Sequence, residues 1–308
     1  MPKENYHFHT FANLPFCADI SQTSNKIVLI GIPFFCEYPG EGGLSSDAPD
    51  IIRIESNRYP EDPQAWDFDL GGSLEKVCNK KIVDIGNLAV TPGDKEGNRH
   101  IIETTIKEAL QASALPVVLG GDDSIPIPVI GAYEGQEPFF VLQLDAHIDW
   151  RDEINGVREG YSSTMRRASE MPWVRGIIQL GANGVGSARE EELRAAEDYG
   201  AKIITAKEFH EKGKESLLSA LPLGSFCFLT IDFDVLDPSI MPAVGAPTPG
   251  GLYYQETIDL LHAVAMHTSL VGVCLTELAP KKDLNNLGAI TAMRLVWNIL
   301  GTAALARY

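Results

Sequence analysis

Carboxylate and imidazole side chains come directly after two strongly apolar, β-prone runs of the chain. Asp145, His147 and Asp149 follow the first run, and Asp232 and Asp234 follow the second. Alternate residues of an extended chain point the same way, so each group would present its side chains on one side. Four carboxylates and an imidazole that converge in an apolar setting repel one another unless a cation lies between them. The pattern therefore predicts a site for two divalent metal ions.

Two further strand ends carry groups of the same kind. Asp123 lies in a Gly-Gly-Asp-Asp-Ser stretch after one apolar run, and Glu277 follows the last run. Open parallel sheets bind their ligands beyond the carboxyl ends of the strands, where these residues fall. Carboxylate and imidazole ligands suit Mn²⁺, and imidazole also suits Ni²⁺ or Zn²⁺. Two such ions about 3.5–4 Å apart would share a water and lower its pKa, which indicates a hydrolase.

The elements that must position these residues alternate along the chain as short apolar runs and helix-like segments. Most runs are continuous in Val, Ile and Leu, which is typical of strands buried on both faces of a parallel sheet. We expect strands at residues 27–32, 81–85, 116–119, 139–144, 176–180, 202–205, 226–231 and 269–275, and helices at 98–112, 188–199, 254–266 and 287–300. The alternation predicts an α/β fold, a three-layer α/β/α sandwich with a mostly parallel sheet of about eight strands.

Composition bounds the remaining choices. The chain has 308 residues without a linker or repeat, so we expect one domain over 1–308, with 1–25 as an N-terminal extension. A net charge of −17 argues against nucleic acid or an anionic membrane as a partner, and it also favours solubility. Five cysteines lack CxxC spacing, and no apolar leader or long apolar run occurs. These features predict a reduced, cytoplasmic protein that is not exported.

The motifs identify the chain as similar to the ureohydrolases, the arginase, agmatinase and guanidinobutyrase group. The resemblance covers nearly the full length and keeps the family's order. Its segments are Ile30-Gly-Ile-Pro-Phe34, Ala48-Pro-Asp-Ile-Ile-Arg53, Asp84-Ile-Gly86, Leu119-Gly-Gly-Asp-Asp-Ser124, Asp145-Ala-His-Ile-Asp149, Asp232-Phe-Asp-Val-Leu-Asp-Pro238, the Gly-x-Pro-x-x-Gly-Gly stretch over 245–251, and Glu277-Leu-Ala-Pro280. The pair formed by Asp-Ala-His-x-Asp and Asp-x-Asp-x-x-Asp-Pro is highly specific in this order.

The resemblance implies a role for each residue of the metal site. Asp145 and Asp232 would bridge two divalent ions, Mn²⁺ by preference and Ni²⁺ as the alternative. Asp149 would complete the first ion, and His147 and Asp234 the second. Glu277 would face the guanidinium of a small cationic substrate. A bridging hydroxide would attack the guanidino carbon and release urea, or a substituted urea, and an amine. The implied fold is arginase-like, and the implied assembly is a homo-trimer or hexamer.

Four positions depart from the family pattern. Asp123 replaces a metal-binding His, and Ser162-Ser-Thr164 replaces a His-Gly-Thr whose His carries protons. Ala243-Val-Gly-Ala-Pro247 replaces Gly-Thr-Gly-Thr-Pro, and Phe35 stands where the family usually carries Asp. We expect Asp123 to remain a ligand, which adds one negative charge, opposes ionisation of the shared water and favours an oxygen-loving ion.

The lost His leaves proton transfer to water, to Asp149 or to another local group. The other histidines at 100, 210, 262 and 267 are interpreted as structural or surface residues. The family's substrate-recognition loop corresponds to the stretch after Asp149. Substrate-binding candidates there are Asn155, Arg158, Glu159 and Ser162, with Glu277 from the last strand end. Trp150 is interpreted either as a wall of the pocket or as a packing residue.

The leading interpretation is an active metal-dependent hydrolase of a guanidino compound. Agmatine, guanidinobutyrate, guanidinopropionate, guanidine and a biguanide such as metformin all stay open as substrates. The alternative interpretation is a catalytically silent subunit that assembles with an active paralogue as a hetero-oligomer. Retention of the aspartates, His147 and Glu277 favours the active enzyme. An amide hydrolase of the related deacetylase fold fits poorly, because those sites use one metal and a His pair.

Overall fold

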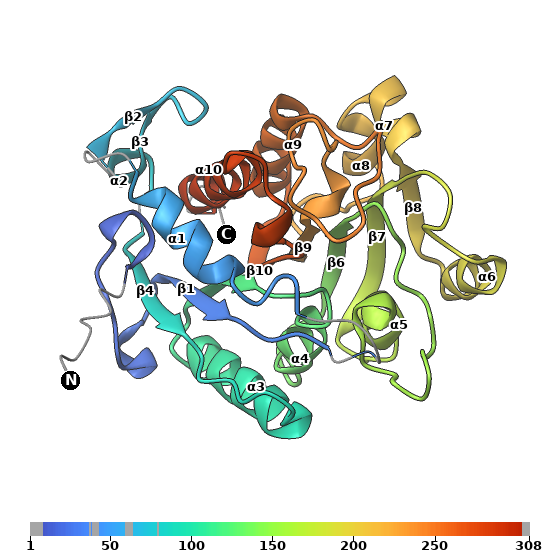
Figure 1. Cartoon of the computed structure of the whole chain (residues 1–308), viewed down its shortest axis with the longest axis horizontal. Coiled ribbons are helices and arrows are strands. Elements are labelled where there is room, and N and C mark those ends of the chain that lie inside the picture. Colours follow the sequence, from blue (N-terminus) through green and yellow to red (C-terminus); the bar gives the residue numbers. More distant parts are fainter. Residues whose placement is uncertain (1–8, 37, 39–42, 59–63, 79, 304–308) are drawn as a thin grey trace.

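An eight-stranded sheet forms the centre of the protein (Figure 1). The structure is a computed structural model, and it describes residues 9–36, 38, 43–58, 64–78 and 80–303. The strand order is β4-β1-β5-β10-β9-β6-β7-β8, and every neighbouring pair is parallel. The strands are β1 (Ile27–Ile32), β4 (Ile82–Asn87), β5 (Leu115–Gly120), β6 (Phe139–Leu144), β7 (Val174–Ala182), β8 (Lys202–Thr205), β9 (Phe226–Asp232) and β10 (Ser269–Thr276). The predicted mostly parallel α/β sheet of about eight strands is confirmed.

Helices cover both faces of the sheet and complete a three-layer sandwich (Figure 1). On one face lie α1, α9 and α10, and on the other lie α3, α4 and α5. The helix bounds are α1 (Ala48–Ser56), α2 (Leu74–Val77), α3 (Lys95–Gln111), α4 (Pro126–Gly131), α5 (Thr164–Ser169), α6 (Glu190–Tyr199), α7 (Ala206–Lys212), α8 (Glu215–Leu218), α9 (Tyr254–His267) and α10 (Leu287–Thr302). Because both sheet faces are covered, the strand interiors are buried on both sides, as their continuous apolar sequences predicted.

Two apolar cores result, one on each face of the sheet. Leu29 and Leu229 belong to the core under α1 and α10, whereas Val28 and Phe228 belong to the core under α3 and α4. Adjacent residues of one strand thus enter different cores, as the alternation of side chains along a strand requires. The burial of both faces fixes the strand register. The register in turn sets where, along the sheet, the polar residues at the end of each strand lie.

The short helices α2, α4, α5, α7 and α8 were not predicted from the sequence, and two further local features also differ from the prediction. Strands β2 (Trp66–Asp67) and β3 (Gly72–Ser73) form a small antiparallel hairpin that was not predicted. Helix α3 begins at Lys95, with Asp94 as its N-cap, so Glu96 and Gly97 lie inside the helix and not before it. The Asp94 side chain accepts a hydrogen bond from the Gly97 N–H, which satisfies a donor of the first turn.

A buried ion pair joins α1 to the outer strand β4. Arg53 and Asp84 are 1% and 0% exposed. The guanidinium donates from Nε and Nη2 to the two carboxylate oxygens, at 2.9 Å each. Asp84 also accepts the Phe11 N–H at 2.9 Å, so it ties the N-terminal segment to the sheet as well. The pair therefore holds three segments of the chain together.

We expect Asp84→Asn to lower the free energy of unfolding by about 3–5 kcal/mol, because it leaves the Arg53 charge buried without its partner. Urea denaturation followed by circular dichroism measures the change. Lys212→Gln is the matched control. Lys212 pairs with Glu208 at 2.8 Å but is 62% exposed, so its loss should cost no more than about 1 kcal/mol. Equal effects of the two substitutions would contradict the structural role of the buried pair.

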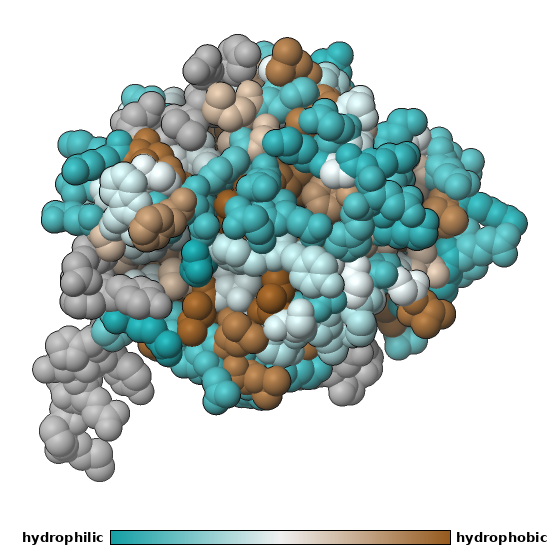
Figure 2. All heavy atoms as spheres, turned by 90° about the horizontal axis from the view of Figure 1, so that it is seen from above, coloured by the Kyte–Doolittle hydropathy of each residue, from teal (hydrophilic) through white to brown (hydrophobic). Residues whose placement is uncertain are grey.

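The molecular surface is polar over most of the face shown in Figure 2, with scattered hydrophobic residues between hydrophilic ones. Within the described residues, no helix is both long and apolar enough to span a membrane. No disulfide joins the five cysteines in the part of the chain that the structure describes, and four of the five are buried.

Candidate metal centre

The four central strands of the sheet bring the predicted site residues to one edge. In spatial order these strands are β5, β10, β9 and β6. Asp123 follows β5, Glu277 follows β10, Asp232 ends β9, and Asp145 follows β6. All four residues are at least nine-tenths buried or line the same cavity. The convergence expected from the sequence is therefore present in the structure.

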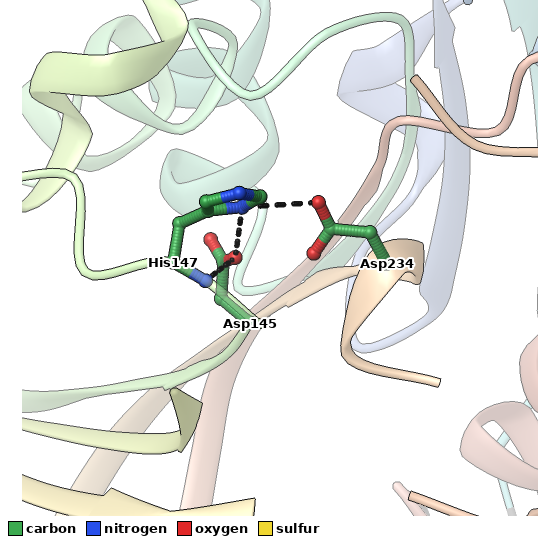
Figure 3. A group of neighbouring side chains, drawn as sticks. All are labelled: Asp145, His147 and Asp234. Carbon is green, nitrogen blue, oxygen red and sulfur yellow. Dashed lines mark hydrogen bonds and ion pairs between the residues drawn. The ribbon is translucent and has the colours of Figure 1, made fainter. Parts of the chain in front are cut away.

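One cluster joins Asp145, His147 and Asp234 (Figure 3). The His147 ring lies between the two carboxylates, with Nδ1 at 3.0 Å from Asp234 Oδ2 and 3.4 Å from Asp145 Oδ1. The His147 backbone N–H donates to Asp145 Oδ1 at 2.6 Å, and the Ala146 N–H donates to Asp234 Oδ1 at 3.2 Å. These backbone donors hold the carboxylates in place and leave other oxygens free to bind a cation.

A second cluster joins Asp123, Asp145 and Asp149, so Asp145 is shared by both. Within each cluster the available ligand atoms lie within 4.8 Å of one another. Asp123 Oδ1 accepts the Thr276 hydroxyl at 2.8 Å. Its other oxygen, Oδ2, is buried and has no hydrogen-bond partner among the described residues. A buried carboxylate oxygen without a donor is costly, and a bound cation would satisfy it. The residues present therefore fit a metal ion.

Two residues of the site adopt a backbone conformation that is rare outside glycine. Asp149 has φ of 52° and Glu277 has φ of 70°. Such conformations cost about 1–3 kcal/mol each and persist only where the surroundings impose them. Glu277 lies directly beyond β10, and Asp149 lies five residues beyond the end of β6 and contributes its carboxylate to the second cluster. Glu277 Oε1 accepts the Asp123 N–H at 2.9 Å, and Oε2 accepts the Ser45 hydroxyl at 3.3 Å.

The metal-free protein cannot easily ionise all of these carboxyl groups. Burial raises the pKa of Glu277 to about 8, with a smaller contribution from the charge of Asp122. Burial and neighbouring carboxylates together hold the pKa of Asp123, and likewise that of Asp145, well above the ordinary range. Burial alone would lower the pKa of His147, but the hydrogen bond to Asp234 and the surrounding negative charge raise that pKa to about 10. This is the electrostatic environment of a cation site.

These shifts predict that the metal-free protein loses stability as the pH rises. The native state keeps a proton on Glu277 up to about pH 8, whereas an unfolded chain releases it near the ordinary pKa of 4.5. The raised pKa of His147 acts in the same direction between 6.5 and about 10. Since the native state binds more protons, the free energy of unfolding should fall from pH 5 to pH 8. Urea titrations of chelator-treated protein measure it; a rise over this range would contradict the prediction.

A cavity of about 830 Å³ opens onto the two clusters. Of the predicted residues, Asn155, Ser162 and Glu277 line it with the metal-ligand candidates Asp123, His147, Asp149, Asp232 and Asp234. The sequence prediction missed several other lining residues, among them Cys36, Tyr38, Arg151 and Glu192. Arg151 Nε donates to Glu192 Oε1 at 2.7 Å, so the cationic side chain lies beside an acidic partner. Phe35, Gly245 and Ala246, from the departures noted above, also line the cavity.

Other predicted residues lie elsewhere in the structure. Arg158 is not a lining residue; it is 54% exposed and pairs with Asp152 and Glu170 at 3.3 and 3.5 Å. Glu159 likewise lies outside the lining and pairs with Arg99. Trp150 is 2% exposed, and its ring contacts that of Tyr199 in a tilted arrangement. It is not among the cavity-lining residues, so it is a packing residue and not a wall of the pocket. None of the histidines at 100, 210, 262 and 267, all within the described ranges, is among the cavity-lining residues.

One further side chain contacts the site directly and was not predicted. Gln143 Nε2 donates to Asp145 Oδ2 and to Asp149 Oδ2, at 2.7 Å each. Its signal in the sequence is a glutamine inside an otherwise apolar strand, at the position two residues before Asp145. A buried amide needs partners, and the nearest strand end offers carboxylates.

The chain is similar to known proteins over most of its length. A sequence profile of the arginase family matches residues 25–301. The chain is 33% identical to an N(1)-aminopropylagmatine ureohydrolase of Thermus thermophilus over 283 residues, 91% of each chain. It is 30% identical to the agmatinase of Pyrococcus horikoshii over 283 residues, 90% of this chain and 92% of the relative.

A solved structure shows the same architecture. The proclavaminate amidino hydrolase from Streptomyces clavuligerus superposes with a TM-score of 0.85 at 26% identity. The match covers 97% of this chain and 98% of that one. A formimidoylglutamase from Bacillus subtilis, at 24% identity and a TM-score of 0.83, shares the fold. The arrangement of sheet and helices is thus that of these hydrolases.

Proposed function

Because the chain belongs to the arginase (ureohydrolase) family, we propose that it is a metal-dependent hydrolase that cleaves a C–N bond of a guanidino compound. The observation that carries the proposal is the shared carboxylate Asp145, which joins two metal-ligand clusters beside one cavity. Water supplies the oxygen of the urea product, and the released amine leaves with a proton. The chain would thus be an active enzyme and not a catalytically silent subunit.

Six residues would hold the metal ions. Asp145 and Asp232 would bridge them, and the remaining ligands would be Asp123, Asp149, His147 and Asp234. Two divalent ions at such a site lower the pKa of a shared water, so that hydroxide is available near neutral pH. Five carboxylates against one imidazole favour Mn²⁺, with Ni²⁺ as the alternative. The buried, unpartnered Oδ2 of Asp123 supports its place in this set.

Glu277 is the residue that we assign to the guanidinium. Its carboxylate lines the cavity beside Asp123, where it accepts hydrogen bonds from a backbone N–H and a serine hydroxyl. A planar guanidinium matches a carboxylate in both charge and donor geometry. Ser162 replaces the family's proton-carrying His at the cavity, so we assign proton transfer to water and to Asp149. A missing imidazole acid–base typically costs about 10²–10⁴-fold in rate, so we expect slower turnover than a site that keeps this His would give.

The cavity lining favours a substrate with a cationic or neutral tail. Acidic side chains outnumber basic ones among the described lining residues, and the arginine there, Arg151, is paired with Glu192. The relatives named agmatinase and N(1)-aminopropylagmatine ureohydrolase point to guanidino amines. We therefore place agmatine and N(1)-aminopropylagmatine first among the substrates, ahead of guanidinobutyrate and biguanides. We also propose a cytoplasmic homo-trimer or hexamer.

Metal analysis followed by a substrate panel tests the proposal. Purified protein is stripped with chelator, reloaded with Mn²⁺ or Ni²⁺, and analysed for metal per chain. It is then assayed for urea and amine release from agmatine, N(1)-aminopropylagmatine, guanidinobutyrate, guanidine and metformin. We expect two ions per chain and turnover of at least one guanidino amine. Protein that binds no metal after reloading would rule the proposal out, and a metal-loaded protein without turnover would favour the silent-subunit alternative.

A further inference from the structure

Two buried glutamines lie side by side beneath the candidate metal centre. Gln143 of β6 and Gln179 of β7 are register partners in neighbouring strands and are 0% and 1% exposed. The residues on either side of them in both strands are apolar. Burying an amide in such a place is unfavourable unless every polar atom finds a partner. Packing alone does not explain the pair, because a leucine would fill the same space without the cost of burying an amide.

Their hydrogen bonds run in one direction, from an indole to the carboxylates. Trp150 Nε1 donates to Gln179 Oε1 at 2.7 Å. Gln179 Nε2 donates to Gln143 Oε1, and Gln143 Nε2 donates to Asp145 and Asp149. An indole nitrogen is only a donor and an ionised carboxylate is only an acceptor. The indole at one end and the carboxylates at the other therefore fix the orientation of the oxygen and nitrogen atoms in each amide.

The same bonds enclose the strained residue of the site. Gln179 contacts the residue before Asp149, through the Ile148 carbonyl at 2.8 Å, and the residue after it, through the Trp150 indole. Asp149 itself accepts from Gln143. The left-handed backbone of Asp149, with φ of 52°, is thus held from both sides and through its own side chain. Strain of this kind persists only where neighbouring contacts impose it.

We infer that Trp150, Gln179 and Gln143 form a positioning relay that sets Asp149 and Asp145 in their metal-binding orientation. The inference rests on the proposed function, since it gives the relay a metal site to serve. Hydrogen bonds to metal-binding side chains orient them, and losing one typically weakens metal binding about 10–100-fold. The residues of the relay are positioning residues, because each acts on the metal through a carboxylate.

Gln143→Met and Gln179→Met test the relay, because methionine keeps the length of the side chain and removes its hydrogen bonds. Competition with a fluorescent chelator gives the Mn²⁺ dissociation constant. We expect it to rise by about 10–100-fold in each variant, and excess Mn²⁺ to restore most of the activity. Thr230→Val is the matched control. Thr230 is the register partner of Gln143 on its other side, is equally buried, and makes no bond to the carboxylates.

A second measurement uses wild-type protein, so that the inference can be tested even if either variant folds poorly. In ¹⁵N-tryptophan-labelled wild type, Mn²⁺ is replaced by diamagnetic Zn²⁺ or Mg²⁺, and the Trp150 indole resonance is followed during titration. We expect it to shift with metal although the indole is not a ligand. Unchanged dissociation constants in both folded variants, or an indole signal that ignores the metal, would overturn the relay alone. Wild type that binds no metal would instead overturn the proposed function.

Discussion

Replacing Asp145 with asparagine should lower kcat/KM by more than about 10³-fold. Among the described residues, Asp145 alone belongs to both ligand clusters, so its loss weakens both metal positions together. Losing a residue that only orients a ligand costs about 10–100-fold, and a shared ligand must cost more. Steady-state assays of urea release, with metal content measured on the same sample, report the effect.

The substitution should also have an opposite effect on the metal-free protein. Burial and the charge of Asp149 raise the pKa of Asp145 well above the ordinary range, so its ionisation opposes folding. The neutral amide removes that cost, and metal-free Asp145→Asn should melt at a higher temperature than metal-free wild type at pH 8. Metal at about 100 times its dissociation constant adds about 2.7 kcal/mol to wild type and almost nothing to the variant. Glu153→Gln, on an exposed residue of the same segment, should change neither property.

Glu277→Gln should reduce kcat/KM by about 10–150-fold while the protein keeps two metal ions per chain. The loss equals the roughly 1.5–3 kcal/mol that a hydrogen bond to a charged group contributes. The effect separates guanidinium recognition from metal binding, because both Glu277 oxygens already accept hydrogen bonds, from the Asp123 N–H and the Ser45 hydroxyl, and Glu277 belongs to neither ligand cluster. Kinetic constants for agmatine and metal analysis of the same preparation measure both quantities.

The nearby hydroxyl provides the control. Ser45→Ala removes the 3.3 Å hydrogen bond to Glu277 Oε2 and leaves the carboxylate charge in place. We expect a loss of no more than about tenfold from it, since a single neutral donor contributes about 1 kcal/mol. If Glu277→Gln lost its metal along with its activity, the carboxylate would belong to the metal site, and its assignment to the guanidinium would be wrong.

The strands and their polar ends were predictable because the signals are local. Continuous apolar runs marked all eight strands of the sheet, and the runs at the centre of the sheet were followed by their carboxylates. The hairpin of β2 and β3 gave no such signal, because each strand has only two residues. Left-handed backbone at Asp149 and Glu277 was equally invisible, since neither residue type requires it and only the surrounding contacts impose it.

The substrate-binding candidates show that closeness to Asp149 in the sequence does not by itself place a residue in the cavity. Asn155 and Gly156, both with positive φ, form a tight turn closed by paired hydrogen bonds between Ile154 and Val157. Such turns reverse the chain within two residues. Asn155 therefore lines the cavity, whereas Arg158 lies outside it on the exposed surface. The contact between Gln143 and Gln179 was not predicted, because these residues lie far apart in the sequence and become neighbours only through the pairing of β6 with β7.

The position of β10 in the sheet has a consequence for how the protein folds. It is the last strand along the described chain, yet it lies between β5 and β9 and joins the two halves of the sheet. During synthesis, β1, β4 and β5 can pair, as can β6 to β9, but each half keeps an open edge until residues 269–276 emerge. Open edges favour aggregation, and such long-range pairing is slow. A metal ion at the second cluster would need Asp123 from one half and Asp145 from the other, so we expect metal binding to follow completion of the sheet.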